Sequence, residues 1–494
     1  MKGDQKPRTP STNSLTAYST NNLSNNSDQD YRGHETETLF TDAVADSDCR
    51  IAILEQEEAA QRRHEERIQK QGNDGFSVAT PSTLTDSQSD KKCFGRTVRL
   101  HANLMRVRSG GVQKVTNMEL FFDLVFVYAI SAISETLFEN LIWETFLEML
   151  LITLAVWWAW VYTAWITNWF NPDSYLVRLL LLTLMLASLI LSSVIPEAFG
   201  EQSVLFACMF VAIQLGRTTA VILCLHGHRL QMNFVRIFFW ELLASICWIV
   251  GAVIGGNARN IIWTVGVAFD YISPWSGYYT PGLGRSATND WTIHGGHLSE
   301  RCSLFIILAL GESIVVTGEG FLHVLHNPAG VGTFMVAFVG ATAMWWIYFH
   351  SASDEATEFI ENSDDPGEMG RLAYTYIHVL MVGGIILSAV ADRISMEDPY
   401  LIPAHENKMV EVAVMIGGPT LFVFGHALFR MTFCNCFPRA HVATVVVLLC
   451  LTPMAIHVPI WITALTTTSL LLILSFYESY WRCMIVHHHT QAID

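Results

Sequence analysis

The sequence predicts an all-α, polytopic membrane protein, a bundle of about 12 transmembrane helices in two parallel six-helix repeats. Hydrophobic residues make up 51% of its 494 residues and charged residues only 15%. The apolar residues form long blocks, and about 17–25 apolar residues suffice to cross a hydrocarbon core of ~30 Å. The predicted spans lie near 116–138, 145–167, 176–195, 203–225, 233–256, 259–273, 297–317, 331–350, 371–391, 409–431, 440–457 and 459–481. The sixth of these spans is short.

The parts of the chain outside the spans differ in composition. Its beginning is rich in Ser, Thr, Asn, Asp and Gln and has no secretory hydrophobic region, which predicts a disordered cytoplasmic tail. The predicted organisation is a tail at 1–90, a basic juxtamembrane segment at 91–114, membrane repeat 1 at 115–275, a connecting loop at 276–296, membrane repeat 2 at 297–482 and a C-terminal tail at 483–494.

The distribution of Lys and Arg predicts the orientation. Seven basic residues crowd the segment before the first span, and basic residues beside spans favour the cytoplasmic side. With twelve spans, both termini are expected in the cytoplasm. The net charge of −16 comes largely from the tail and the loops, so it indicates no basic partner, and we expect no nucleic-acid partner.

The 10 cysteines have no CxxC spacing, and half of them, Cys208, Cys224, Cys247, Cys302 and Cys450, fall inside apolar spans. They are expected to be reduced packing residues. We therefore expect no metal site, and the sequence contains no haem, nucleotide-binding or phosphate-binding motif, so we expect no cofactor. The expected partners are membrane lipid and a lipophilic small-molecule substrate or a proton-coupled solute.

Three successive helices repeat in order. Glu119 begins the first span and Glu300 lies early in the seventh. The following spans share an aromatic run, WWAWVY from Trp157 and WWIYFH from Trp345, and the next pair both begin with an arginine. This order predicts a six-plus-six duplication with both halves in the same orientation, related by an axis along the membrane normal. A functional cavity would then lie between the halves.

The first span carries two carboxylates at membrane depth. Glu119 and Asp123 are four residues apart, so they share one face of a helix. Thr116 and Glu119 also fit a capping box, which would make Glu119 a structural residue. That explanation does not cover Asp123, which lies one turn deeper among apolar neighbours.

The seventh span carries a second polar series. His294, His297 and Glu300 recur every three residues, a spacing that allows a proton relay, and Arg301 can pair with Glu300 or another acid. Interfacial pairing would make part of this series structural. Glu312 lies in the middle of the span, about 16 Å along the helix from Arg301, so it needs another partner or a proton.

Aromatic residues and two further arginines complete the set of residues at membrane depth. Aromatic faces can stabilise cations, although packing is their commoner role. The predicted cavity walls are Trp157, Trp158, Trp160, Tyr162, Trp345, Trp346 and Tyr348. Arg217 and Arg430 occupy similar places in the fourth and tenth spans, so each is expected to neutralise a carboxylate of its own half.

Two segments carry a family resemblance. MELFFDLVFVYAIS from Met118 and PGLGRSATNDWTIHGGHLSERCSLFIILALGESIVVTG from Pro281 resemble the low-temperature-requirement A (LtrA) family of membrane proteins. The resemblance covers roughly residues 110–485, and the tail outside it suggests a eukaryotic, fungal version. It implies a multi-pass membrane protein whose marked positions are Glu119, Asp123, His297, Glu300, Arg301, Glu312 and Ser313. It implies no biochemical activity, because the family is named after a growth phenotype.

Two functions from different classes fit these residues. The first is a membrane-bound acid-catalysed cyclase or isomerase of a prenyl or terpenoid substrate, with Asp123 or Glu312 as the acid, assisted by Glu119, His297 and Glu300. Its carbocations would be stabilised by the aromatic walls. The alternative is a proton-coupled transporter or channel in which Glu312, Glu300 and His297 exchange protons. A third, plainer function is a lipid-responsive scaffold.

The kind of cavity discriminates among these functions. The enzyme requires an aromatic-lined pocket that contains the acid and is reachable from lipid. The transporter requires polar routes toward both water faces, and a scaffold requires a core filled by side chains. The combination of acids and aromatic residues at mid-span narrowly favours the enzyme on sequence alone.

Overall fold

The computed structural model describes residues 104–106, 114–286, 295–351, 366–403, 408–434 and 437–493. The chain divides into two units, and all of the described residues belong to the second, residues 60–494. The predicted tail, most of the basic segment, the end of the connecting loop and His294 lie outside the described residues.

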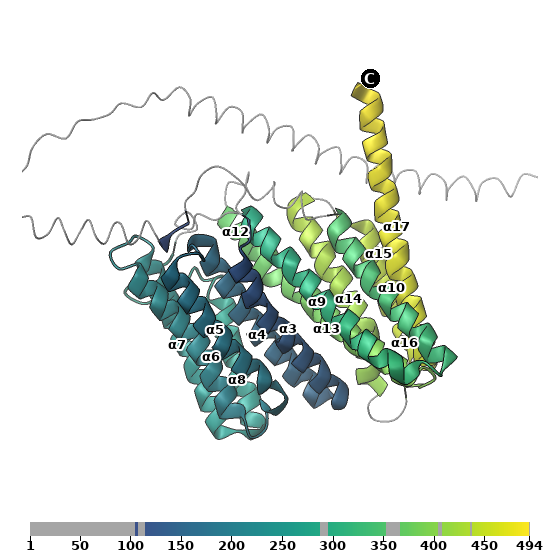
Figure 1. Cartoon of the computed structure of the whole chain (residues 1–494), viewed down its shortest axis with the longest axis horizontal. Helices are drawn as coiled ribbons and strands as arrows, with labels where there is room; N and C mark the ends of the chain where they lie inside the picture. The colour runs from purple at the N-terminus through teal and green to yellow at the C-terminus, as the bar shows by residue number, and fades with distance from the viewer. Residues whose placement is uncertain are drawn as a thin grey trace, which may run out of the picture. The chain divides into compact units, whose positions relative to one another are not determined.

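All the long elements of the described chain are helices, and Figure 1 shows them as two groups of roughly parallel rods. The first half contains α3 (Asn117–Glu139), α4 (Trp143–Trp169), α5 (Tyr175–Ser193), η1 (Ile195–Glu197), α6 (Ser203–Cys224), α7 (Gln231–Ile254) and α8 (Gly256–Ile272). The second half contains α9 (Gly295–Val324), α10 (Pro328–Ser351), α12 (Pro366–Gly370), η3 (Arg371–Ile377), α13 (His378–Glu397), α14 (Lys408–Cys434), α15 (Arg439–Cys450), α16 (Thr452–Ala455) and α17 (Ile460–Ile493).

Ten of the described helices are long and apolar enough to cross a membrane. The predicted sixth and eleventh spans correspond to shorter helices, α8 with 17 residues and α15 with 12. The predicted all-α, polytopic membrane bundle is confirmed. Helices satisfy every backbone polar group within one segment, which is why an apolar chain of this kind adopts them in lipid.

The helix contacts repeat between the two halves. In the first half α3 packs on α4 and α5, and the chain α5, α6, α7, α8 continues pairwise, with α8 returning to α4. In the second half α9 packs on α10 and α13, the chain α13, α14, α15, α17 continues pairwise, and α17 returns to α10. This is the pattern that a six-plus-six duplication requires. Helices α3 and α4 of the first half contact α9 and α13 of the second.

A π-helical turn joins the halves. The segment η3 (Arg371–Ile377) is π-helical and leads into α13. The indole N–H of Trp157 donates to the carbonyl oxygen of Thr375 at 2.7 Å, and that of Trp165 donates to the Thr375 hydroxyl at 2.9 Å. Single π-helical turns are rare and are frequent at functional sites.

The tightest helix crossing lies between α13 and α14. A Cβ atom on Gly384 would come within 2.6 Å of the backbone nitrogen of Phe422, and one on Gly418 within 2.7 Å of the backbone nitrogen of Ser388. Small residues of this kind let two membrane helices approach at backbone distance. The neighbouring Gly417 has open space around the position of a Cβ atom.

This crossing makes a direct prediction. Gly418→Ala forces backbone atoms apart and is expected to destabilise the protein by about 1–3 kcal/mol, the usual range for overpacking. Gly417→Ala is the matched control and is expected to leave stability unchanged. Thermal unfolding of both full-length variants in mild detergent checks this, and equal melting temperatures would contradict the crossing.

Candidate functional site

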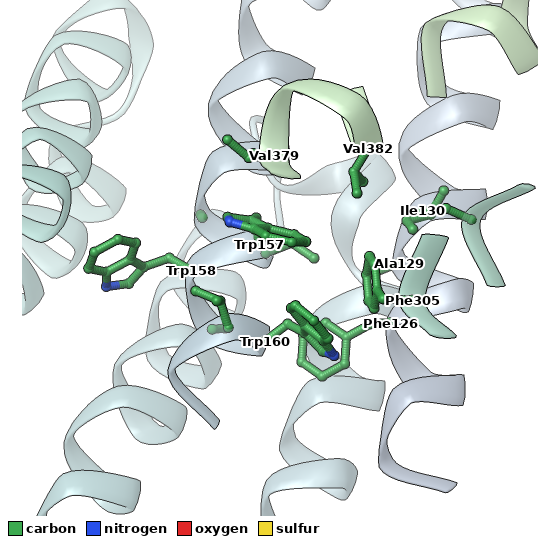
Figure 2. Close-up of a cluster of buried hydrophobic side chains, with 14 of the residues drawn as sticks. Phe126, Ala129, Ile130, Trp157, Trp158, Trp160, Phe305, Val379 and Val382 are labelled. Atoms are coloured by element: carbon green, nitrogen blue, oxygen red, sulfur yellow. The ribbon is translucent and has the colours of Figure 1, made fainter. Parts of the chain in front are cut away.

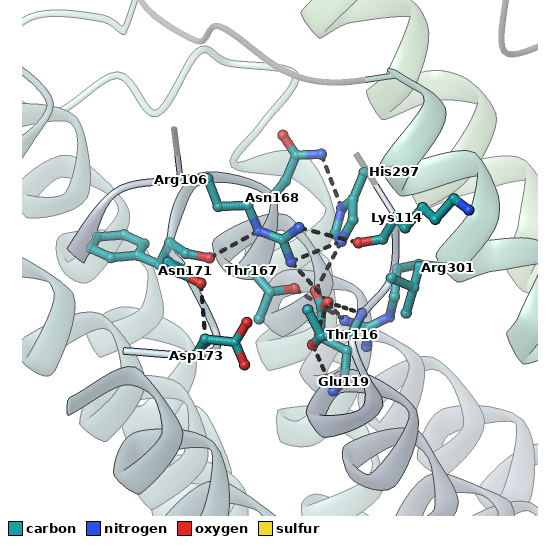
Figure 3. A network of polar contacts seen from close by, with 12 residues as sticks. Arg106, Lys114, Thr116, Glu119, Thr167, Asn168, Asn171, Asp173, His297 and Arg301 are labelled. Atoms are coloured by element: carbon teal, nitrogen blue, oxygen red, sulfur yellow. Dashed lines mark hydrogen bonds and ion pairs between the residues drawn. The ribbon is translucent and has the colours of Figure 1, made fainter. Parts of the chain in front are cut away.

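A buried charge network joins α3, α4 and α9 around Glu119 (Figure 3). Glu119 is at the third position of α3, where it completes the capping box with Thr116. Its Oε2 accepts from the Thr116 backbone at 2.9 Å and from the Arg106 guanidinium at 2.8 Å. Its Oε1 lies 2.9 Å from His297 Nε2 and 3.2 Å from Arg301 Nη1. Glu119 is therefore both a helix cap and the centre of the network.

Asp123 lies one turn deeper and contacts the same arginine. Its Oδ1 accepts from Arg301 Nη2 at 2.5 Å and from the indole N–H of Trp160 at 2.7 Å. All three side chains are fully or almost fully buried. Arg301 also donates to the Thr167 hydroxyl at 3.0 Å and stands 5.8 Å from the centre of the Trp160 ring. A carboxylate held by two donors is an ion-pair acceptor and a poor proton donor.

His297 has three polar neighbours. Its Nε2 faces a Glu119 oxygen, which can only accept when ionised, and also Nη2 of Arg106 at 3.2 Å, which can only donate. Its Nδ1 lies 3.3 Å from the amide nitrogen of Asn168. The two carboxylates and the two arginines balance in charge, while Oδ2 of Asp123 and Nε of Arg301 have no hydrogen-bond partner in the described part of the chain.

The structure separates the other predicted acids from this network. Glu300 accepts from the backbone N–H of Val115 at 3.0 Å, and so fixes the chain just before α3. Glu312 is buried further along α9, and its carboxyl group faces the Ser131 hydroxyl of α3, with Glu135 and Glu319 nearby. Ser313, beside it, has a buried hydroxyl oxygen without a hydrogen bond in the described part of the chain.

Three of the predicted wall residues, Trp157, Trp158 and Trp160, are packed in the core (Figure 2), whereas Tyr162 lines a cavity described below. Trp157 and Trp160 are at most 2% exposed, and both contact the Phe305 ring, with centroids 5.6 and 4.2 Å away. Trp158 is equally buried on another side of α4, where it contacts Tyr162 and Tyr271.

In the second half, two of the equivalent residues lie on the surface and one lies in the core. Trp345 and Trp346 are 44% and 43% exposed on the outer face of α10. Tyr348 is buried, and its hydroxyl lies 2.9 Å from His378 Nε2.

Each half holds a buried arginine at an equivalent helix. Arg217 of α6 is 3.0 Å from Glu241 of α7, and Arg430 of α14 is 2.5 Å from Glu478 of α17. In the second half His441 lies 3.7 Å from Glu478, and its Nε2 is 2.8 Å from Nδ1 of His426.

Two cavities lie beside these clusters. The first, which we call the aromatic pocket, encloses about 620 Å³ with its open mouth included, and most of its lining is apolar. It lies between α4, α7 and the turn after α8 in the first half, and α12 and η3 in the second. Its lining is Tyr162, Trp165, Ile166, Trp169, Phe234, Ile237, Pro274, Tyr278, Gly367, Arg371 and Thr375. None of these described lining residues carries a carboxyl group.

The second cavity, which we call the Asp392 cavity, has about 370 Å³ of empty space with its open mouth included, between α10, α13, α14 and α17. Beside the Asp392 carboxyl group, its lining has four hydroxyl side chains, Ser388, Ser395, Thr467 and Thr468, and the remaining lining residues are apolar. In the described part of the chain, no ion pair or hydrogen bond joins Asp392 to another side chain. The buried Ser388 hydroxyl oxygen is also without a hydrogen-bond partner there.

Comparison with known proteins identifies the family. Residues 114–476 match the family described as Bacterial low temperature requirement A protein (LtrA). The chain belongs to the LtrA family. It is 32% identical over 350 residues to an uncharacterized protein of Rhizobium meliloti (strain 1021). The aligned region covers 69% of this chain and 83% of that protein. No solved structure matches it significantly.

Sequence reasoning missed several residues of this LtrA-family chain. Arg106 and Asn168 complete the charge network, and Glu478 and His441 complete the cluster around Arg430. No cation pairs with Asp392 in the described part of the chain. Its sequence signal was a carboxyl group near the end of an apolar span, beside Arg393, but the structure pairs Arg393 with Glu135 and Glu397 instead.

The LtrA-family charge network predicts a large and specific loss of stability. Arg301→Gln leaves two buried carboxylates short of a cation and is expected to cost about 3–5 kcal/mol, because breaking a buried pair strands a charge. Arg393→Gln removes a partly exposed pair with Glu135 and is expected to cost less than about 1 kcal/mol.

Thermal unfolding of the two Arg→Gln variants in the same detergent measures the difference. Adding Asp123→Asn to Arg301→Gln should restore part of the lost stability, since one stranded charge is removed. Similar losses in both single variants would contradict the network.

Proposed function

We propose that this LtrA-family protein is a proton-coupled membrane transporter and that Asp392 is its proton-binding group. The observation that carries the proposal is a carboxyl group on the apolar helix α13 that lines a cavity together with four hydroxyl side chains and has no ionic partner among the described residues. Such a group costs at least about 2.5–3.5 kcal/mol to insert, so it tends to persist where it lines a pathway.

The surroundings of Asp392 suit the binding and release of a cation. Pro419 lies inside α14 and has no N–H, so the carbonyl of Met415, four residues earlier, lacks its usual helical donor. Met415 and Pro419 both line the Asp392 cavity. Carboxyl, hydroxyl and freed carbonyl oxygens around an interrupted helix are typical of ion sites in secondary transporters.

A second set of titratable groups lies in the same half. His378 begins α13, and Asp392 follows fourteen residues later, roughly 21 Å along the helix. His378 contacts Tyr348, whose ring lies 6.4 Å from that of His426, and His426 contacts His441. Histidine and carboxyl groups in series are common in membrane proton relays. This series would serve one side of the membrane and Asp392 the other.

The acid-catalysed enzyme is supported less well. A cyclase needs its proton donor in the cavity that holds the aromatic walls. The aromatic pocket contains no carboxyl group, while Asp123 is bound to Arg301 and Trp160. Glu312 borders neither of the two cavities.

Proton movement tests the proposal. The full chain is reconstituted into liposomes that contain a pH-sensitive dye, a potassium gradient with valinomycin sets the membrane potential, and a panel of organic solutes is added. Asp392→Asn cannot bind a proton, so its solute-dependent proton uptake should fall at least about tenfold.

The matched control is Glu397→Gln, which neutralises an exposed carboxylate on the same helix and should leave uptake unchanged. Uptake that is equal in Asp392→Asn and wild type would overturn the assignment of Asp392. No uptake above protein-free liposomes with any solute would overturn transport itself.

A further inference from the structure

The aromatic pocket has one charged wall and is otherwise apolar. Aromatic and aliphatic side chains form most of the lining, and Arg371 is the charged member. One guanidinium nitrogen of Arg371 donates to the carbonyl of Pro274 at 3.0 Å. Arginine has five N–H donors, and in the described part of the chain no carboxylate pairs with this one.

The remaining polar groups of the pocket are neutral. The hydroxyl groups of Tyr162 and Tyr278 contact each other. Burial raises the pKa of Tyr278, so its hydroxyl stays protonated and adds no negative charge. The Thr375 hydroxyl accepts from Trp165. The pocket therefore combines a single positive charge with neutral donors and a large apolar surface.

We propose that the aromatic pocket binds an amphiphilic anion, with the anionic head on Arg371 and the apolar body against the aromatic side chains of α4 and α7. Concave, mostly apolar sites with a few polar groups are typical of small-molecule binding, and this lining has that composition. A planar guanidinium is the side chain best suited to hold a carboxylate or phosphate through two parallel hydrogen bonds.

The position of the pocket connects binding to the rest of the protein. Its walls come from both halves, and Thr375 in the π-helical turn is held by two indole N–H groups of α4. An occupant would contact both α4 and η3, and η3 continues directly into α13, which carries Asp392. If this ligand is the transported substrate, that role rests on the proposed transport function. Its binding to the pocket does not depend on that function.

Direct binding tests the proposal. Tritiated laurate is bound to the purified full-length protein in an uncharged maltoside detergent, and dodecanol, which has the same chain without the charge, is the competing control. Laurate should bind at least about tenfold more tightly than dodecanol, the difference expected for a charge-assisted hydrogen bond. Arg371→Gln should remove that preference.

Three further variants keep the result interpretable. Arg178→Gln removes an exposed arginine that pairs with Asp173 on α5 and should leave laurate binding unchanged. Arg371→Lys keeps the charge and should bind with intermediate affinity. Ile237→Trp fills the pocket and should abolish binding of laurate and dodecanol alike, so it decides the matter if Arg371→Gln fails to fold.

Competition by a short-chain phosphatidic acid identifies the source of the anion. If it displaces laurate, the site takes lipid head groups as well. If it does not, the site takes single-chain anions only, and both results support an amphiphilic anion. Equal affinity for laurate and dodecanol, or unchanged laurate binding in Arg371→Gln, would overturn the proposal. Binding without proton uptake in liposomes would retain this site and reject the transport function.

Discussion

The lipid interior offers no water to an ionisable side chain, so each buried charge in this fold must be satisfied by the protein itself. The network around Glu119 meets this constraint by pairing two carboxylates with two arginines. It draws donors from the segment before α3, from the end of α4 and from the start of α9, and so it ties the first half to the second. Arg217 with Glu241 and Arg430 with Glu478 meet the same constraint within each half.

Asp392 differs from these paired acids because no cation pairs with it in the described part of the chain. Glu312 and Asp270 are also buried without an ion pair there, but neither lines the aromatic pocket or the Asp392 cavity. A buried carboxyl group without a cation is expected to hold a proton, whereas one paired with arginine is expected to remain ionised. The paired acids stabilise the helix arrangement, and Asp392, which lines a cavity, is the acid that we propose for function. The Asp392 cavity lies within the second half, and the aromatic pocket lies between the halves.

The sequence predicted the membrane bundle because apolar block length is a direct physical requirement of the bilayer. It also indicated the capping box of Glu119, whose parts are three residues apart. It could not identify the pairing of Asp123 with Arg301, which are 178 residues apart, because that contact depends on how α3 packs on α9. The shared aromatic runs gave no information about which way each helix faces. As a result Trp157 lies in the core, while Trp345, at the equivalent position, lies on the outside.

The protonation of Asp392 is the central claim, and infrared spectroscopy of the reconstituted full chain tests it most directly. The spectrum is recorded across a pH titration for the wild type and for Asp392→Asn. We expect the carbonyl stretching band of a protonated carboxyl group to be present in the wild type, to disappear as the pH rises, and to be missing from the variant. Identical carboxyl bands in the two proteins at every pH would contradict the account.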